Sequence, residues 1–171
     1  MLTLYDYQLE CVNKLDALAS GVLVAPTGSG KTMMGAALAW REVNRGGHVA
    51  FVVPRNNLAS QTAQCLRHKW GLSTGYVLGG EQENKTAKVQ VVSYQSLGSK
   101  RRSLEWVGDK TTLWIIDECH ITAFAQSLQP YLLRCKRKIG LTATPWQLGQ
   151  RSLLDIFDDP VFAPPPKELI R

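Results

Sequence analysis

The sequence contains no apolar run that approaches the roughly 20 residues a helix needs to span a bilayer. Its first ten residues, MLTLYDYQLE, contain no basic segment followed by an apolar one, so we expect no secretory signal peptide. No internal repeat or low-complexity tract interrupts the 171 residues. These absences argue against a membrane, secreted or repeat protein, and they predict a cytoplasmic protein with no membrane partner.

Cysteine is scarce, and its spacing is not that of a metal or disulfide framework. None of the four cysteines belongs to a CxxC pair; they are Cys11, Cys65, Cys119 and Cys135. The three histidines do not complete a zinc-like spacing; they are His48, His68 and His120. We therefore expect reduced thiols and neither a disulfide nor a zinc framework.

Acidic residues are outnumbered, with 14 Asp and Glu against 20 Lys and Arg and a net charge of +6. A basic balance fits a nucleic-acid partner but does not require one. Hydrophobic residues make up 44% of the chain and charged residues 20%, an ordinary globular composition. The length is enough for one domain with a substantial core.

Short β-branched runs alternate with longer amphipathic stretches along the chain. We expect strands at 21–25, 48–53, 73–78, 88–92, 111–116 and 137–143, and helices at 5–20, 31–43, 57–70 and 124–134. Nearly continuous apolar strands separated by helices predict an α/β fold whose mostly parallel central sheet is covered on both faces. Ligands of such folds bind beyond the carboxyl ends of the strands.

The end of the chain has a different composition from the rest. Residues 145–171 read PWQLGQRSLLDIFDDPVFAPPPKELIR, with a proline run from Pro164 to Pro166. Such a run breaks helix and sheet and often marks a connector between domains. We therefore predict one domain over 1–150, followed by a tail or linker over 151–171.

The stretch APTGSGKT (25–32) stands between an expected strand and an expected helix. It matches the phosphate-loop pattern GxxxxGK[ST], apart from Ala25 in the place of the first glycine. Gly28 and Gly30 allow the backbone to curl so that its N–H groups converge on phosphate oxygens, and the following helix adds its positive end. Nucleotide contacts are expected from Pro26, Thr27, Gly28, Ser29, Gly30, Lys31 and Thr32.

A bound nucleotide gives roles to the polar residues in and near the loop. Lys31 is expected to place its charge on the terminal phosphates, and the Thr32 hydroxyl is expected to bind Mg²⁺. In LWIIDECHIT (113–122) an apolar strand runs into Asp117 and Glu118 at the binding edge. Asp117 fits as a second Mg²⁺ ligand, and Glu118 fits as the group that orients or deprotonates the attacking water.

The two residues after the acid pair receive different expectations. Cys119 is expected to be a small buried residue. A structural histidine is the ordinary alternative for His120, but its place beside the acid pair favours a catalytic coupling role.

The phosphate loop, DECH (117–120) and LTATP (141–145), in this order, resemble the superfamily 2 helicases and translocases. The resemblance covers the first, RecA-like motor domain of that family, from residue 1 to about 150. LTATPWQLGQRSLLDIF (141–157) is most similar to the XPB-like and phage UvsW-like branch, which acts on DNA. The pairing of TATP with DECH argues against the RNA-unwinding DEAD-box branch, which typically pairs DEAD with SAT.

The resemblance assigns base recognition to the start of the chain. Tyr7-Gln8 resembles the pair that contains the family's adenine-recognition glutamine, so Gln8 is expected to bind the nucleotide. The branch usually carries an arginine where this sequence has Tyr5. The ring of Tyr5 can stack on adenine, and this departure leaves the selectivity for the base open.

The resemblance also implies contacts with a nucleic-acid backbone. VVPRNNLASQ (52–61) resembles motif Ia, Gly79-Gly80 the Ib region, and VVSYQSL (91–97) the stretch after it. The implied contacts are Pro54, Arg55, Gly79, Gly80, Ser93, Tyr94 and Gln95. An ordinary turn is the alternative for the two glycines, and a helix N-cap is the alternative for Ser93. Thr142 and Thr144 resemble motif III, which couples the nucleotide site to the nucleic acid; strand-end capping is their alternative.

As a whole, the resemblance implies ATP and Mg²⁺ as cofactors and DNA, single- or double-stranded, as the partner. A second RecA-like domain in the same full-length chain would supply arginines that nothing in these 171 residues resembles. We therefore expect low ATPase activity from this chain alone. The alternatives are an ATP- and DNA-binding module without turnover of its own, a motor fragment of a restriction-enzyme subunit, and an RNA helicase.

Overall fold

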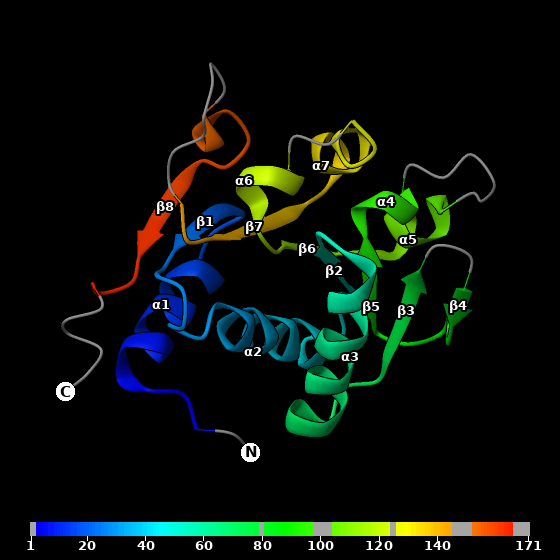
Figure 1. Ribbon diagram of the computed structural model, residues 1–171, viewed down its shortest axis with the longest axis horizontal. Helices are drawn as coiled ribbons and strands as arrows, with labels where there is room; N and C mark the ends of the chain where they lie inside the picture. Colours follow the sequence, from blue (N-terminus) through cyan, green and yellow to red (C-terminus); the bar gives the residue numbers. More distant parts are fainter. Residues whose placement is uncertain (1–2, 79–80, 98–103, 124–125, 145–151, 166–171) are drawn as a thin grey trace.

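Figure 1 shows the computed structural model, which describes residues 3–78, 81–97, 104–123, 126–144 and 152–165. Eight strands form one sheet in the order β4-β3-β5-β2-β6-β7-β1-β8. The strands are β1 (Ser20–Val24), β2 (Val49–Val53), β3 (Thr74–Leu78), β4 (Glu81–Glu83), β5 (Val89–Ser93), β6 (Leu113–Ile116), β7 (Arg137–Thr142) and β8 (Asp159–Phe162). All neighbours run parallel except β3 and β4, so the expected mostly parallel sheet is confirmed.

Helices cover both faces of the sheet, as the near-continuous apolar strands predict (Figure 1). One face carries α1 (Asp6–Asp16), α2 (Lys31–Asn44) and α3 (Asn56–Trp70). The other carries α4 (Tyr94–Leu97), α5 (Glu105–Lys110), α6 (Cys119–Thr122), α7 (Gln129–Arg134) and the 3₁₀ turn η1 (Leu153–Asp155). Strand β2 shows how the core divides, because Phe51 packs into the first layer and Ala50 and Val52 into the second.

Three expected elements differ from the structure. The helix expected over 5–20 is shorter, because α1 ends at Asp16 and Ser20 already belongs to β1. Of the helix expected over 124–134, the described residues 126–134 contain the six-residue α7, which has Pro130 in its first turn and follows a turn at 126–128. The segment expected to be a tail over 151–171 contains η1 and β8, and β8 pairs in parallel with β1. Phe157 and Val161 are buried there, so this part of the segment belongs to the domain.

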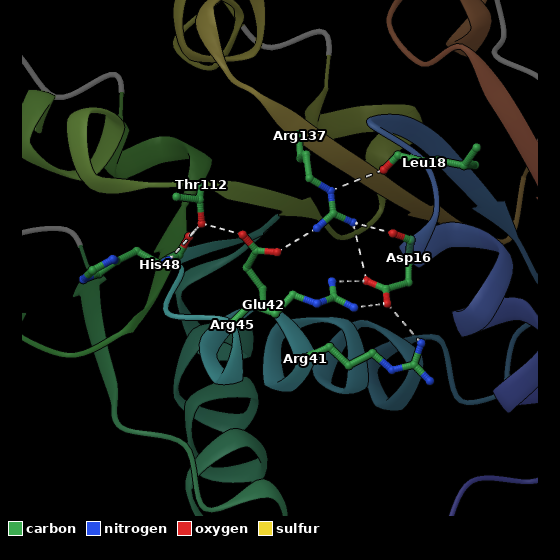
Figure 2. A network of polar contacts seen from close by, with 8 residues as sticks. All are labelled: Asp16, Leu18, Arg41, Glu42, Arg45, His48, Thr112 and Arg137. Carbon is green, nitrogen blue, oxygen red and sulfur yellow. Dashed lines mark hydrogen bonds and ion pairs between the residues drawn. The ribbon is translucent and has the colours of Figure 1, made fainter.

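A network of charged side chains ties α1 and α2 to the edge of the sheet where β2, β6 and β7 begin (Figure 2). Asp16 accepts hydrogen bonds from Arg41 (3.2 Å) and from Arg45 (2.8 Å). Arg137 donates to Glu42 (2.7 Å) and also to the backbone carbonyl of Asp16 (3.1 Å). These contacts join three elements at the edge opposite the expected binding loops.

Replacing Asp16 with Asn is expected to lower the free energy of unfolding by about 2 kcal/mol at pH 7, because Arg41, Arg45 and Arg137 lose their carboxylate partner. The hydrogen bond from Arg45 holds the pKa of Asp16 below its usual value. The contribution is therefore complete above the unfolded-state pKa and is lost as the pH falls through the folded-state pKa. Urea unfolding of both proteins at pH 7 and near pH 3 measures this.

The exposed Asp158 offers the matched control, since Asp158→Asn should leave stability unchanged within about 0.5 kcal/mol. A gap between Asp16→Asn and the parent that is as wide in acid as at neutral pH would contradict the ionic origin of the effect.

Candidate functional site

The expected nucleotide residues lie on loops at one edge of the sheet. Strands β1, β6 and β7 run parallel, and β7 lies between the other two. The phosphate loop follows β1, the acid pair follows β6, and Thr142 ends β7. Since the carboxyl ends of parallel strands share an edge, the fold brings these three segments of distant sequence together (Figure 1).

The phosphate loop turns through two glycines in the left-handed region. Gly28 has φ +83° and Gly30 has φ +84°, values that side chains with a Cβ rarely adopt. Gly30 is the N-cap of α2, which has neither a capping side chain nor an acidic residue in its first turn. The positive end of this 14-residue helix is therefore not neutralised from within its own first turn, which suits an anionic ligand.

The polar side chains of the loop are positioned around this turn. The Lys31 ammonium donates to the carbonyl oxygens of Ala25 (3.1 Å) and Pro26 (3.2 Å). The Ser29 hydroxyl is buried and has no hydrogen-bond partner among the described residues, an arrangement that leaves a polar atom for a ligand. Thr32 is half-buried in the first turn of α2.

The acid pair lies in an electrostatic environment shared with Lys31. Burial raises the pKa of Asp117 to about 6, with the charge of Glu118 acting in the same direction. The positive charge of Lys31 acts in the opposite direction and lowers the pKa of Asp117. A buried carboxylate with a raised pKa is a group that a cation would stabilise in its ionised form.

Glu118 has a backbone conformation that is uncommon for a residue with a side chain. Its φ of 48° and ψ of 46° lie in the left-handed region, and it is the N-cap of the short helix α6. Strained residues of this kind cluster at functional sites. Cys119, the next residue, is fully buried, as expected.

His120 links the acid pair to the residues after β7. Its Nδ1 lies 2.9 Å from the Thr142 hydroxyl and 3.5 Å from the Glu118 carboxylate. The Thr142 hydroxyl also donates to the Thr144 carbonyl (3.0 Å) and accepts from the Thr144 N–H (3.0 Å). A continuous polar path therefore runs from Glu118 to Thr144.

The start of the chain contacts the phosphate loop through Ser29. The Gln8 amide (2.9 Å) and the Tyr7 hydroxyl (2.8 Å) both donate to the Ser29 carbonyl. The rings of Tyr5 and Tyr7 are stacked, with centroids 6.1 Å apart and an interplanar angle of 6°. Sequence reasoning missed the contact of Tyr7; the aromatic spacing of Tyr5 and Tyr7 beside Gln8 was the available signal.

The described nucleic-acid candidates lie at the carboxyl ends of β2 and β5, which are paired so that Val53 is opposite Ser93. Arg55 and Gln95 are exposed, and Pro54 and Tyr94 are half-buried. Ser93 is fully buried, and its hydroxyl accepts from the backbone N–H of Ser96 (3.2 Å). This is the helix-capping arrangement that the sequence left as the alternative. Gly79 and Gly80 lie outside the described residues.

The described residues contain no cluster of three or more His, Cys, Asp or Glu side chains suited to a metal ion. Mg²⁺ usually takes only one or two protein ligands and completes its shell with water and phosphate, so the expected ligands Thr32 and Asp117 do not depend on such a cluster. All four cysteines are free. No described helix combines the length and apolar character that crossing a membrane requires.

A family model described as "Type III restriction enzyme, res subunit" matches residues 1–147. The chain is 34% identical over 149 residues to Rad25 of Haloarcula marismortui, which carries the provisional name of a DNA 3'-5' helicase; the match covers 84% of this chain and 23% of that protein. It is 30% identical over 162 residues to the DNA 3'-5' translocase XPB2 of Sulfurisphaera tokodaii, covering 94% of this chain and 35% of that protein.

Among solved structures, the UvsW helicase from bacteriophage T4 superposes with a TM-score of 0.77 at 21% identity. That superposition covers 94% of this chain and 60% of UvsW, and at this identity it shows a shared fold. The chain spans between about a quarter and a third of the length of the two curated relatives.

Proposed function

This chain belongs to the family described as the res subunit of type III restriction enzymes, and on that premise we propose that it is the N-terminal motor domain of an ATP-dependent DNA helicase or translocase. The observation that supports the proposal best is the phosphate loop, whose two left-handed glycines precede Lys31, beside the Asp117–Glu118 pair. Helicase families use a nucleoside triphosphate, typically with Mg²⁺. We propose more specifically that the nucleotide is ATP and that the nucleic acid along which the motor moves is DNA.

Each polar residue of the edge has a role in this proposal. The loop from Pro26 to Thr32 would hold the phosphates, with the Lys31 ammonium on the terminal ones. Thr32 and Asp117 would hold Mg²⁺, which when bound neutralises charge on the phosphate oxygens. The raised pKa of Asp117 supports this role, because a buried carboxylate gains from a nearby cation.

Hydrolysis would use Glu118 as the group that orients water and accepts its proton. The water oxygen forms a bond to the terminal phosphorus while the bond to the bridging oxygen breaks, giving ADP and inorganic phosphate. The polar contacts from Glu118 through His120 and Thr142 to Thr144 would couple hydrolysis at the nucleotide site to the nucleic-acid site.

DNA would lie across the ends of β2 and β5, where Arg55 and Gln95 are exposed. Phosphate contacts of this kind position a strand without reading its bases. Ser93 would act there by shaping the start of α4, since its hydroxyl is buried in a cap.

A motor subunit of a restriction enzyme is the second candidate, and the description of the matched family favours it. Such a subunit would use the same nucleotide and DNA residues, so the two candidates differ in partner proteins and not in the site. Co-purification of a methylase or nuclease partner with this chain would separate them.

Replacing Lys31 with Ala is expected to weaken binding of ATP by about 10²-fold, because the phosphates lose a partly desolvated positive charge. Equilibrium binding of a nucleotide with a fluorescent label on its ribose measures the change, with Mg²⁺ present. Lys136→Ala is the matched control, because this exposed lysine precedes β7 at the opposite edge of the sheet. Equal affinities of the Lys31→Ala and Lys136→Ala proteins would contradict the proposed nucleotide site.

A further inference from the structure

We propose that this site accepts nucleoside triphosphates with little regard to the hydrogen-bonding edge of the base, because Gln8 holds the phosphate loop and does not read the base. The inference rests on the proposed function, since it concerns the same nucleotide site. It departs from the adenine-reading role that the resemblance implied for Gln8. Three observations carry it: the hydrogen bonds of Gln8, its packing against Gly30, and the exposed ring of Tyr5.

The side-chain amide of Gln8 is occupied by the protein on both of its ends. Its Nε2 donates to the Ser29 carbonyl at 2.9 Å and lies 3.4 Å from the Tyr7 hydroxyl oxygen. Its Oε1 accepts the backbone N–H of Tyr5 at 3.1 Å. An amide has two N–H donors, and reading the edge of adenine needs one donor and one acceptor together. The two donors of Gln8 already face protein oxygens.

The orientation of this amide is fixed by its partners. The Tyr5 N–H is a donor and requires the oxygen of the amide, whereas the Ser29 carbonyl is an acceptor and requires the nitrogen. Reversing the amide would place oxygen against oxygen at Ser29 and nitrogen against nitrogen at Tyr5. The amide therefore joins the N-cap of α1 to the phosphate loop in one orientation.

Gln8 also packs tightly against the loop. It is only 6% exposed, and a Cβ placed on Gly30 would lie 2.4 Å from its Nε2. The amide of Gln8 therefore fills the space that a side chain at position 30 would need. If the amide turned toward a base, the Ser29 carbonyl would keep only the hydrogen bond from the Tyr7 hydroxyl among the two side-chain bonds described here. Gln8 is in this sense a positioning residue for the loop.

The ring of Tyr5 is the group that remains for the base. It is 71% exposed although it is aromatic. It stacks with the nearly parallel ring of Tyr7, whose hydroxyl donates to the Ser29 carbonyl. Stacking on an aromatic ring tolerates every base, because each base has a π-face. A site that binds the base by stacking alone has affinities that follow the stacking strength of each base. It should therefore bind purine nucleotides more tightly than pyrimidine nucleotides, with similar affinities for ATP and GTP.

Competition with ATP, GTP and CTP for a ribose-labelled fluorescent nucleotide on the 171-residue chain tests this inference. We expect dissociation constants for ATP and GTP within about threefold of each other and weaker binding of CTP by about tenfold, because stacking alone distinguishes the bases. A site with a hydrogen-bonding edge would instead reject the mismatched base by orders of magnitude. A preference of more than tenfold for ATP over GTP would overturn the inference and leave the proposed function intact.

Variants separate the positioning role from a base-reading one. Gln8→Ala should weaken ATP and GTP by the same factor, whereas loss confined to ATP would mean that Gln8 reads adenine. The ratio of the ATP affinity to the GTP affinity is informative even if part of the Gln8→Ala protein is unfolded, because unfolding lowers both apparent affinities equally. Gln64→Ala, which changes an exposed glutamine of α3, is the matched control and should change neither affinity.

Tyr5→Ala should weaken ATP and GTP by about tenfold each, and Tyr5→Phe, which keeps the ring, should retain most of the affinity. Undiminished binding by Tyr5→Ala would overturn the stacking role. If no triphosphate binds the parent chain, or if Lys31→Ala binds as well as the parent, the proposed function fails and the inference fails with it.

Discussion

Joined to a second RecA-like domain in one polypeptide, this domain is expected to hydrolyse ATP about 10³- to 10⁵-fold faster than the 171-residue chain alone, the range that an arginine finger contributes. Lys31 is the cation whose charge acts on Asp117 within the described part of the chain. One lysine leaves the charge on the transferring phosphoryl group incompletely balanced. Steady-state ATPase rates of both proteins, with and without single-stranded and double-stranded DNA, measure the difference.

Two controls give this rate comparison its meaning. Lys31→Ala in the 171-residue chain sets the background, and the chain alone should turn over no faster than this variant. Removing the arginine from the added domain should return the two-domain protein toward the same background. If the chain alone shows a DNA-stimulated rate that Lys31→Ala abolishes, it completes the site by self-association and the argument for a missing arginine is wrong.

The middle of the sheet could be predicted because strands β2, β5 and β6 are buried along their whole length. Strand β2 is buried at all five positions, and β6 at all four, which is the pattern of a parallel sheet covered on both faces. The resemblance to XPB-like superfamily 2 motor domains is confirmed by the matched family and relatives, and the UvsW helicase shares the fold. Both results rest on patterns that extend over many residues.

The elements that sequence reasoning missed are short or carry a mixed pattern. Strand β8 has four residues, of which only Val161 is buried, and Pro160 removes one backbone donor. Strand β8 is held in the sheet by its parallel pairing with β1, and nearby Phe157 is buried in the layer that contains η1. Neither contact can be recognised from the spacing of apolar residues along the chain. A tail was the natural expectation for such a segment.

For the candidate site, the sequence indicated which edge of the sheet the loops share, but not which contacts their side chains make. The phosphate loop and the acid pair are brought to one edge of the sheet, as their positions after strands predicted. The sequence could not show that the Gln8 amide donates a hydrogen bond to the Ser29 carbonyl, since this bond joins residues 21 positions apart. Nor could it decide between a contact and a cap for Ser93, because both uses suit a serine at the end of a strand.

Replacing Glu118 with Gln is expected to lower the rate of ATP hydrolysis by the two-domain protein by about 10²- to 10⁴-fold, the range that general base catalysis supplies. ATP binding should be unchanged, because the amide has the same shape and Asp117 and Lys31 keep their charges. Single-turnover hydrolysis and equilibrium binding of the ribose-labelled nucleotide measure the two effects separately. Glu105→Gln, which changes an exposed glutamate of α5, should alter neither.

The two measurements together decide what Glu118 does. If hydrolysis survives in Glu118→Gln, the carboxylate does not activate water and the assignment is wrong. If binding and hydrolysis fall by the same factor, the charge of Glu118 serves to hold the nucleotide and its metal, a role proposed here for Asp117. Loss of hydrolysis alone is the outcome that its position predicts, since Glu118 is held in a left-handed conformation with His120 at 3.5 Å, next to the residue proposed to hold the metal.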